Sequence, residues 1–251
     1  MPPAKKKTKV SHQTDKTASV LRSDYRTAWP VKSGDESIEI IAKDETFVVH
    51  RSVLTKHSSY FEAAAKKCFT ESDGVIRFDD IDPKYFALFL GVAYSYSSIV
   101  PHNAPGPSSN PQTKTKRTPL RDYIEVYKLC DRFVCPAIAD FMILCIDAAI
   151  GDGHRAMFHS QKDDEQQKWQ IRDFADGYEV LEMNHLTQKQ VAQRMIQYFC
   201  EGVSYRAWEK CVEEIEDKPR FVAHVSRGFA HKLVDICEQR GKPKRKELRG
   251  P

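Results

Sequence analysis

The sequence lacks the patterns that mark membrane, secreted and disulfide-bonded proteins. No run of about 18 apolar residues occurs, which argues against a membrane span. The first seven residues, Met1-Pro2-Pro3-Ala4-Lys5-Lys6-Lys7, carry no apolar core of a secretory signal. The seven cysteines are odd in number and form no Cys-x-x-Cys pair, so we expect reduced thiols, several of them in the core. These absences together predict an intracellular protein with no membrane partner.

Motifs for chemistry are also missing. The run Gly151-Asp152-Gly153-His154 lacks the spacing and the Lys-Ser/Thr of a phosphate loop. His154 and His159 are five residues apart and no Cys pair accompanies them, unlike the usual zinc site. His50 and His57 are expected to be satisfied structural histidines. We therefore predict no catalytic residue, no metal and no cofactor; the alternative is an enzyme site assembled from distant residues.

The charge is unevenly distributed along the chain. Residues 1–32 hold 8 Lys+Arg and 2 Asp+Glu, a net charge of +6, and residues 241–251 hold 5 Lys+Arg and 1 Glu, a net charge of +4. Subtracting both ends from the totals of 39 and 35 leaves 26 basic and 32 acidic residues in 33–240, a net charge of −6. A body of that sign is a poor phosphate-binding surface, so no direct nucleic-acid binding is expected of it.

The two basic ends have two interpretations. The clusters consist of Lys5, Lys6, Lys7 and Lys9 at one end and of Lys242, Lys244, Arg245 and Lys246 at the other. Such runs are typical of nuclear import signals, but they also occur as solvated, disordered tails. The predicted location is the nucleus, the cytoplasm or both.

A strand followed by a helix forms the centre of the sequence pattern. Thr46 to His50 is rich in β-branched and aromatic residues and predicts a strand, paired with 38–41 through a turn at 42–45. The apolar period then becomes helical over 52–67, with Ser52 as the expected cap. We expect this helix to end near Cys68. Phe69, Thr70 and Glu71 would then lie on a loop before a strand at 75–78.

The remaining pattern is mostly helical. Asp82 and Pro83 predict the start of an almost wholly apolar, central helix, and further helices are expected over 120–131 and 137–149. A Pro-rich insertion at 100–119 is either a spacer or a docking segment. Gly151-Asp152-Gly153 is expected to separate a helical tail, in which Thr187 and Gln190 form a capping box. Its last helix carries apolar residues from Phe221 to Leu233, and Cys237 is expected to be a core thiol. The predicted units are 1–32, 33–150, 151–240 and 241–251.

These residues carry a resemblance to a known family. The ordered run of Phe47, Val49-His50-Arg51-Ser52, Tyr60-Phe61, Phe69, Glu71, Ile76, Phe78, Asp82-Pro83 and Phe86 resembles a BTB/POZ domain, and Asp131, Phe133 and Pro136 resemble its closing helical hairpin. Residues 174–233 are similar to the helical tail of many fungal BTB proteins. The resemblance implies an α+β fold, with a small mixed β-sheet flanked by α-helices and a helical C-terminal region after it. It also implies protein partners.

The resemblance gives a role to two short stretches. In family members that serve as adaptors of cullin-type ubiquitin ligases, a hydrophobic-x-acidic triplet follows the Tyr-Phe helix, and Phe69, Thr70 and Glu71 match it in type and place. The other interpretation is that Phe69 packs under its own helix and Glu71 faces water. Ser37 stands where the family usually has an Asp near its dimer interface, so a homodimer is left open.

Two functions follow from the resemblance. The first is a substrate adaptor for a cullin-type ubiquitin ligase. The second is a nuclear regulatory protein that oligomerises or recruits corepressors through the BTB surface, without a DNA-binding domain of its own.

Overall fold

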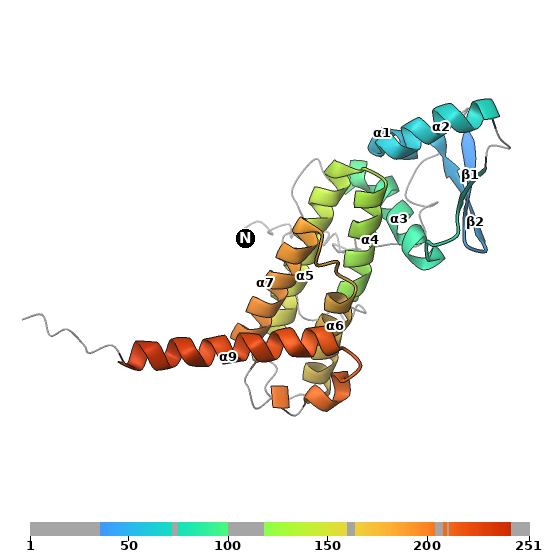
Figure 1. The fold of residues 1–251 in the computed structure, drawn as a ribbon. Coiled ribbons are helices and arrows are strands. Elements are labelled where there is room, and N and C mark those ends of the chain that lie inside the picture. The colour runs from blue at the N-terminus through green and yellow to red at the C-terminus, as the bar shows by residue number, and fades with distance from the viewer. Residues whose placement is uncertain are drawn as a thin grey trace, which may run out of the picture.

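In the computed structural model, a three-stranded sheet occupies one end of the molecule and helices make up the rest (Figure 1). The structure describes residues 36–71, 75–99, 118–159, 164–203, 208–209 and 211–241. The basic clusters, the terminal tails and most of the Pro-rich insertion lie outside these residues. The element order is β1 (Ser37–Ala42), β2 (Glu45–His50), α1 (Arg51–His57), α2 (Ser59–Glu71), β3 (Val75–Phe78), α3 (Pro83–Ile99), α4 (Leu120–Arg132), α5 (Pro136–His159), α6 (Asp164–Glu179), α7 (Leu186–Gly202), η2 (Val212–Ile215) and α9 (Pro219–Gly241).

The sheet is mixed, as predicted. Strand β1 pairs antiparallel with β2 and parallel with β3, which gives the order β2-β1-β3. Alternate residues point inward and are buried, because successive side chains in a strand face opposite sides. The inward set is Ile38, Ile40, Ala42, Phe47, Val49, Ile76 and Phe78. The predicted α+β fold class, with a small sheet, flanking helices and a helical C-terminal region, is confirmed.

The helix predicted over 52–67 is in fact two helices, α1 and α2, separated at Ser58. The expected cap at Ser52 is wrong, because α1 already begins at Arg51 without a side-chain cap. Ser58 performs the capping for α2: its Oγ accepts a hydrogen bond from the Phe61 amide at 3.1 Å and donates one to the Phe133 carbonyl. Because Phe133 lies 75 residues away, the local sequence pattern could not predict the hydrogen bond from Ser58.

Helices α3, α4 and α5 follow the predicted positions but extend further at their C-terminal ends. Asp82 caps α3 as expected, since its Oδ1 accepts a hydrogen bond from the Lys84 amide at 2.9 Å. The expected separation at Gly151-Asp152-Gly153 is wrong, because α5 continues through it to His159. A Cβ on Gly153 would lie 2.5 Å from Cε2 of Phe174, so this glycine allows α6 to approach α5 closely.

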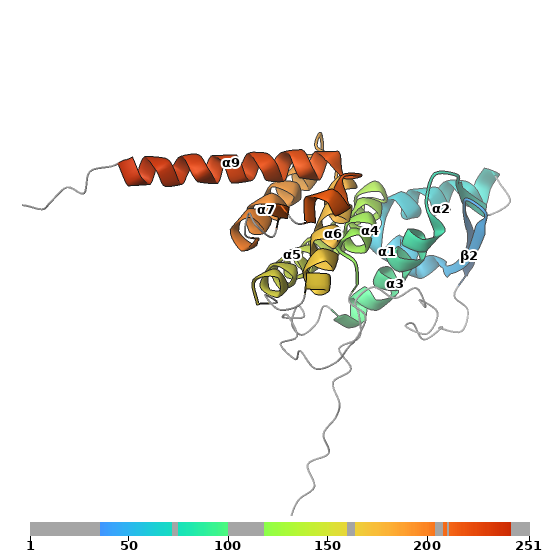
Figure 2. The same cartoon turned by 90° about the horizontal axis from the view of Figure 1, so that it is seen from below.

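Helix α6 packs on α4 and α5, α7 packs on α5, and α9 packs on α6 and α7 (Figures 1 and 2). The predicted capping box is wrong: α7 begins at Leu186, the Thr187 side chain bonds Tyr127, and no side-chain cap is present. The last helix buries Phe221, Val225 and Phe229, while Leu233 is exposed; Cys237 is also exposed, against the expectation of a core thiol. Both views show why, because the second half of α9 projects beyond the bundle.

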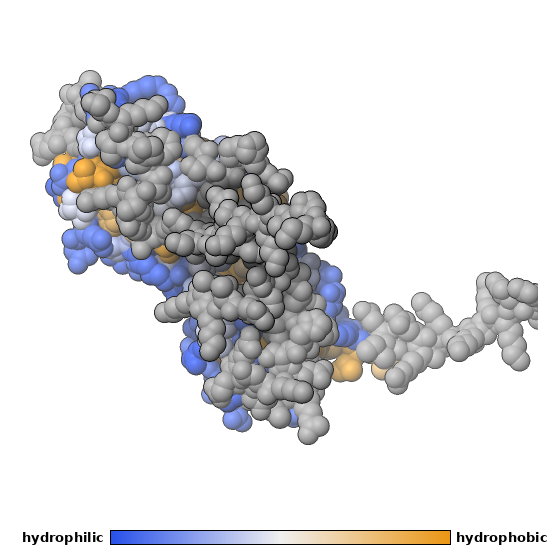
Figure 3. Space-filling model, turned by 180° about the vertical axis from the view of Figure 1, so that it is seen from behind, coloured by the Kyte–Doolittle hydropathy of each residue, from blue (hydrophilic) through white to orange (hydrophobic). Residues whose placement is uncertain are grey.

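The described residues that are visible on the face drawn in Figure 3 are mostly hydrophilic. Figure 3 shows one face of the molecule, on which only small, separate apolar patches appear, at the sheet end and near the projecting end of α9. Within the described ranges, no helix is both long and apolar enough to cross a membrane.

Candidate protein-interaction site

The predicted triplet lies in the last turn of α2 and not on a loop, which corrects the expectation for Phe69, Thr70 and Glu71. Their side chains lie outside the part of the structure that is described. Positions two apart in an α-helix do not share a face, so residues 69 and 71 cannot offer one flat binding surface. Glu71 is the last residue of α2. A single partner that contacts both positions would have to engage the end of the helix.

An aromatic cluster holds the other end of α2 in place. The Phe133 ring is fully buried, and its centroid lies 4.7 Å from that of Phe61, 5.3 Å from Phe78 and 5.2 Å from Phe89. These rings come from α2, β3, α3 and the α4–α5 turn. Aromatic pairs in this range contribute about 0.5–1.5 kcal/mol each beyond simple burial. The start of α2 is therefore fixed by packing against three other elements.

Two apolar side chains at this end of α2 are exposed. Tyr60 is 38% exposed and Val134, in the α4–α5 turn, is 53% exposed. The two elements touch, since the Ser59 amide donates a hydrogen bond to the Val134 carbonyl at 3.4 Å. Val134 has φ = 54°, which is unusual for a β-branched residue. Sequence reasoning placed neither residue in a site, because a helical period shows which residues share a face but not what covers that face.

The start of β1 is tied to the β2–α1 junction. Ser37 is exposed and pairs in register with His50. The preceding residue, Glu36, has a carboxylate, but that carboxylate accepts a hydrogen bond from Arg51 at 2.8 Å. Ser37, at the position where the resemblance implies an interface Asp, is thus neutral. The neighbouring carboxylate of Glu36 is already paired with Arg51. Whether the chain forms a homodimer through this surface therefore stays an open prediction.

The two histidines of this unit differ. His50 is satisfied as predicted: the Tyr94 hydroxyl lies 2.9 Å from its Nδ1 and accepts a hydrogen bond from its backbone amide at 3.0 Å. His57 is not, because its buried Nε2 has no hydrogen-bond partner among the described residues. Burial, followed by the nearby charge of Lys56, lowers the pKa of His57 below its ordinary value. The prediction of two satisfied histidines is wrong for His57.

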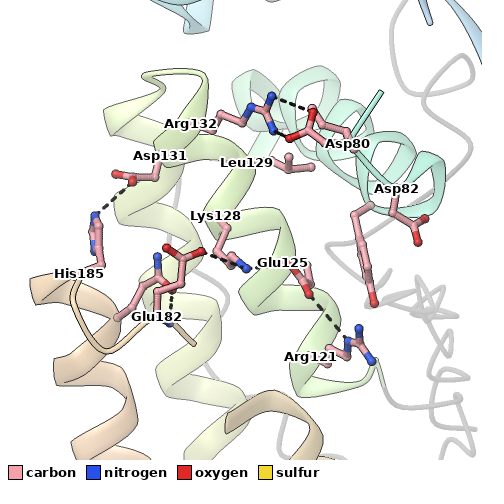
Figure 4. A pocket seen from close by; sticks show the side chains of 13 residues that line it. Asp80, Asp82, Arg121, Glu125, Lys128, Leu129, Asp131, Arg132, Glu182 and His185 are labelled. Carbon is pink, nitrogen blue, oxygen red and sulfur yellow. Dashed lines mark hydrogen bonds and ion pairs between the residues drawn. The ribbon is translucent and has the colours of Figure 1, made fainter. Parts of the chain in front are cut away.

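A polar hollow of ≈ 520 Å³ lies where the C-terminal helices meet the sheet-containing part of the chain. It is bordered by the β3–α3 loop, by α4 and by the α6–α7 loop. Figure 4 shows the charged side chains of the polar hollow pointing toward one another in pairs. The labelled members are Asp80, Asp82, Arg121, Glu125, Lys128, Leu129, Asp131, Arg132, Glu182 and His185.

The cations of the polar hollow are held by its own carboxylates. Arg132 donates to both Asp80 oxygens, at 2.5 and 3.0 Å, and this bond lowers the pKa of Asp80 and raises that of Arg132. The Lys128 ammonium lies 3.5 Å from Glu125 and 3.4 Å from Glu182, and it donates a hydrogen bond to the Val180 carbonyl. Such internally paired charges favour a structural role for the polar hollow over the binding of a charged ligand.

Three contacts join the C-terminal helices directly to the sheet-containing part. Lys128 of α4 reaches Glu182 and Val180, and His185 Nε2 lies 3.1 Å from Asp131 of α4. Only Asp131 was named from the sequence, as part of the closing hairpin. The others come from segments more than 50 residues apart, and no spacing in the sequence could have grouped them.

Two observations concern metal-ligating residues and thiols among the described residues. No group of three or more His, Cys, Asp or Glu in the described ranges is placed to hold a metal ion. Burial raises the pKa of Cys135, Cys145 and Cys200 to about 11, so these thiols stay protonated at neutral pH and are not nucleophiles.

Comparison with known proteins identifies the class of domain to which this arrangement corresponds. Residues 37–107 match the family model of the BTB/POZ domain, and the described part of that range contains the sheet and helices α1 to α3. The chain thus contains a BTB/POZ domain, a protein–protein interaction fold, followed by a helical C-terminal region. A search of curated proteins found no significant match. The similarity of the tail to fungal BTB proteins stays a prediction.

Proposed function

We propose that this protein is a substrate adaptor that binds a cullin-type ubiquitin-ligase scaffold through the end of α2. The BTB/POZ match supports the general class, a protein–protein interaction module. The finer proposal depends on one observation: the hydrophobic-x-acidic triplet Phe69, Thr70 and Glu71 occupies the helix end that follows the anchored Tyr60-Phe61 turn. The exposed Tyr60 and Val134 add apolar surface at the other end of the same helix.

The expected energies are large enough to detect. A Phe side chain that becomes buried against a partner contributes about 1.5–3 kcal/mol. A charge-assisted hydrogen bond to Glu71 would contribute a similar amount, about 1.5–3 kcal/mol. Since about 1.4 kcal/mol is tenfold in affinity, loss of either contact should weaken binding by about tenfold or more.

The test measures binding of the full chain to an isolated cullin N-terminal region. Glu71→Ala should weaken binding about tenfold and Phe69→Ala with Glu71→Ala should abolish it at micromolar protein, while the melting temperature of the single variant is unchanged. Glu62→Ala is the matched control, because Glu62 lies in the same helix and is exposed. Absence of cullin binding by the wild-type protein, or equal losses in the control, would refute the proposal.

The second candidate is a nuclear regulatory protein that recruits corepressors or oligomerises through the BTB surface. The basic clusters at the two ends support it, and they consist of Lys5, Lys6, Lys7, Lys9, Lys242, Lys244, Arg245 and Lys246. Strand β2 supports it too, since β2 pairs only with β1 within the described residues and Val48 on it is 47% exposed. Replacing both clusters by Ala should move a tagged protein from the nucleus to the cytoplasm. An unchanged distribution would leave both clusters as solvated charge.

A further inference from the structure

A second hollow lies in the C-terminal region, away from the BTB/POZ domain. It has a volume of ≈ 380 Å³ and runs between α7 and α9, with the end of α6 at its side. We call it the basic groove. Its lining is contributed by Tyr178, Met183, Lys189, Ala192, Gln193, Ile196, Gln197, His224, Arg227, Gly228 and His231. Positions 189, 193 and 196 on α7, and 224, 228 and 231 on α9, each follow the spacing of one helical face. The basic groove is therefore a strip along two packed helices, about two turns long.

The floor of the basic groove is apolar because the two helices approach closely. A Cβ on Gly228 would lie 2.6 Å from the Cys200 Sγ and 3.3 Å from Cγ2 of Ile196, so only glycine fits here without displacing α7. Ile196 and Met183 are half-buried, which leaves part of each open to the groove. Apolar side chains in a concave site offer a partner the area that gives affinity.

The rim carries positive charge that the described residues do not neutralise. Lys189 and Arg227 are exposed, and neither side chain has an ion pair or hydrogen bond to another described residue. Among the residues that the structure describes, no Asp or Glu lines the basic groove. The carboxylate of Glu201, one turn beyond on α7, accepts a hydrogen bond from Gln197. His224 is held by the Tyr178 hydroxyl, 2.7 Å from its Nδ1, and burial raises the pKa of Tyr178 to about 12.

We propose that the basic groove binds a short peptide segment of another protein that combines acidic with large apolar side chains. The apolar floor would take the apolar side chains, and Lys189 and Arg227 would pair with the carboxylates. Charge complementarity of this kind gives specificity and speeds association. The exposed side chain of Gln193 would be available for the peptide backbone. The groove would thus supply a second interaction surface, whichever scaffold the BTB/POZ domain binds.

The charges also argue against an occupant from the same chain. The longer segments outside the described residues are basic: the net charge is +6 over 1–32 and +4 over 241–251, and residues 100–117 contain Lys114, Lys116 and Arg117 but no Asp or Glu. A basic segment would be repelled by Lys189 and Arg227. Nucleic acid matches the charge, but its polar backbone gains nothing from the apolar floor formed by Met183 and Ile196.

The test selects peptides of about 12 residues from a random display library on the full chain, since this length more than covers the groove. Recovered peptides should combine Asp or Glu with Leu, Phe, Met or Trp. Their affinity, measured by fluorescence polarisation, should fall about tenfold or more with Lys189→Glu and Arg227→Glu together, and also when the peptide carboxylates become amides. Replacing the apolar peptide residues by Ser should cause a similar loss.

The matched control is Arg77→Glu with Arg172→Glu, which makes the same charge change at exposed positions that do not line the groove. The control should keep peptide affinity, and both variants should keep the wild-type melting temperature. An unenriched library, recovered peptides without the acidic and apolar combination, or equal losses in groove and control variants would overturn the proposal. Tighter binding of a single-stranded DNA oligonucleotide that the groove variant abolishes would assign the basic groove to nucleic acid instead.

Discussion

The polar hollow and the basic groove differ in how their charges are paired. In the polar hollow each labelled cation has a carboxylate within 4 Å, and Lys128 contacts both Glu125 and Glu182. In the basic groove, Lys189 and Arg227 have no described partner. Charges that are paired across two elements hold those elements together. Charges that are left unpaired on an apolar concave surface are available to another molecule.

The comparison distinguishes charges that hold the fold together from charges that are available to bind another molecule. The polar hollow joins α4 to the α6–α7 loop, so its charges are used within the fold. Met183, in the same loop, lines the basic groove instead, and the floor of that groove is apolar. A concave surface with charged residues is therefore not by itself a binding site. The partners already present inside the chain decide which role it has.

The largest effect is expected from breaking the cores behind the two surfaces. Phe133→Ala in the BTB/POZ domain and Phe199→Ala in the C-terminal region should each cost about 3–5 kcal/mol of unfolding free energy, because both rings are fully buried. The buried residues form one continuous cluster across both regions. Each variant should therefore lower a single thermal transition, followed by circular dichroism and by tryptophan fluorescence.

Two separate transitions would change the comparison. If Phe199→Ala lowered one transition and left another at the wild-type temperature, the polar hollow would not couple the regions, and the predicted boundary at residue 150 would be a thermodynamic one. Val48→Ala is a useful control, since Val48 is 47% exposed and its loss should change stability by about 0.5 kcal/mol or less.

A smaller effect distinguishes the two hollows directly. Lys128→Met should lower the unfolding free energy by about 1–2 kcal/mol, because Glu182 and the Val180 carbonyl lose their cation or donor and Glu125 keeps only Arg121. Lys189→Met removes the same charge in the basic groove and should change stability by about 0.5 kcal/mol or less. Chemical denaturation of both variants measures the difference. Equal losses would show that Lys189 also stabilises the fold, and the contrast between the hollows would fail.

Much of the fold followed from local pattern. The β-branched and aromatic residues of 46–50 predicted β2, strands were also predicted at 38–41 and 75–78, and the Asp82-Pro83 pair predicted the start of α3. The errors arose where distant residues decide the structure. Gly153 looked like a helix break, since glycine costs about 1 kcal/mol in a helix, but the ring of Phe174 packs on it. Ser58 separates α1 from α2 and is bonded to Phe133, 75 residues away.

The sites were less predictable than the fold. The triplet Phe69, Thr70 and Glu71 was found by resemblance, but its placement on a loop was wrong because α2 continues to Glu71. The basic groove had no sequence signal, since its rim comes from α7 and α9, and residues 189 and 227 become neighbours only through tertiary packing. A helical period gives one face of one helix. It does not tell which two faces will meet.

The smallest effect concerns a polar group that is buried without a partner, a third case beside the two hollows. Nε2 of His57 has no hydrogen bond to a described residue, and its ring lies edge-on to Tyr96 at 5.5 Å. Burial lowers the pKa of His57 in the folded state below 6.5, and the Lys56 charge acts in the same direction. The unfolded chain, with a pKa near 6.5, therefore takes up this proton more readily than the folded protein does.

The sign of the effect follows from that difference. The stability contributed by neutral His57 is complete above pH 6.5 and is lost as the pH falls from 6.5 through the folded-state pKa. His57→Phe keeps the ring contact with Tyr96 but cannot take up a proton. Between pH 7.5 and pH 5.5 its melting temperature should therefore fall less than that of the wild type. Acid-sensitive groups elsewhere cancel in the difference between the two proteins. An equal fall in both would mean that His57 has a partner in solution, and that the BTB/POZ domain leaves no buried ring nitrogen unpaired.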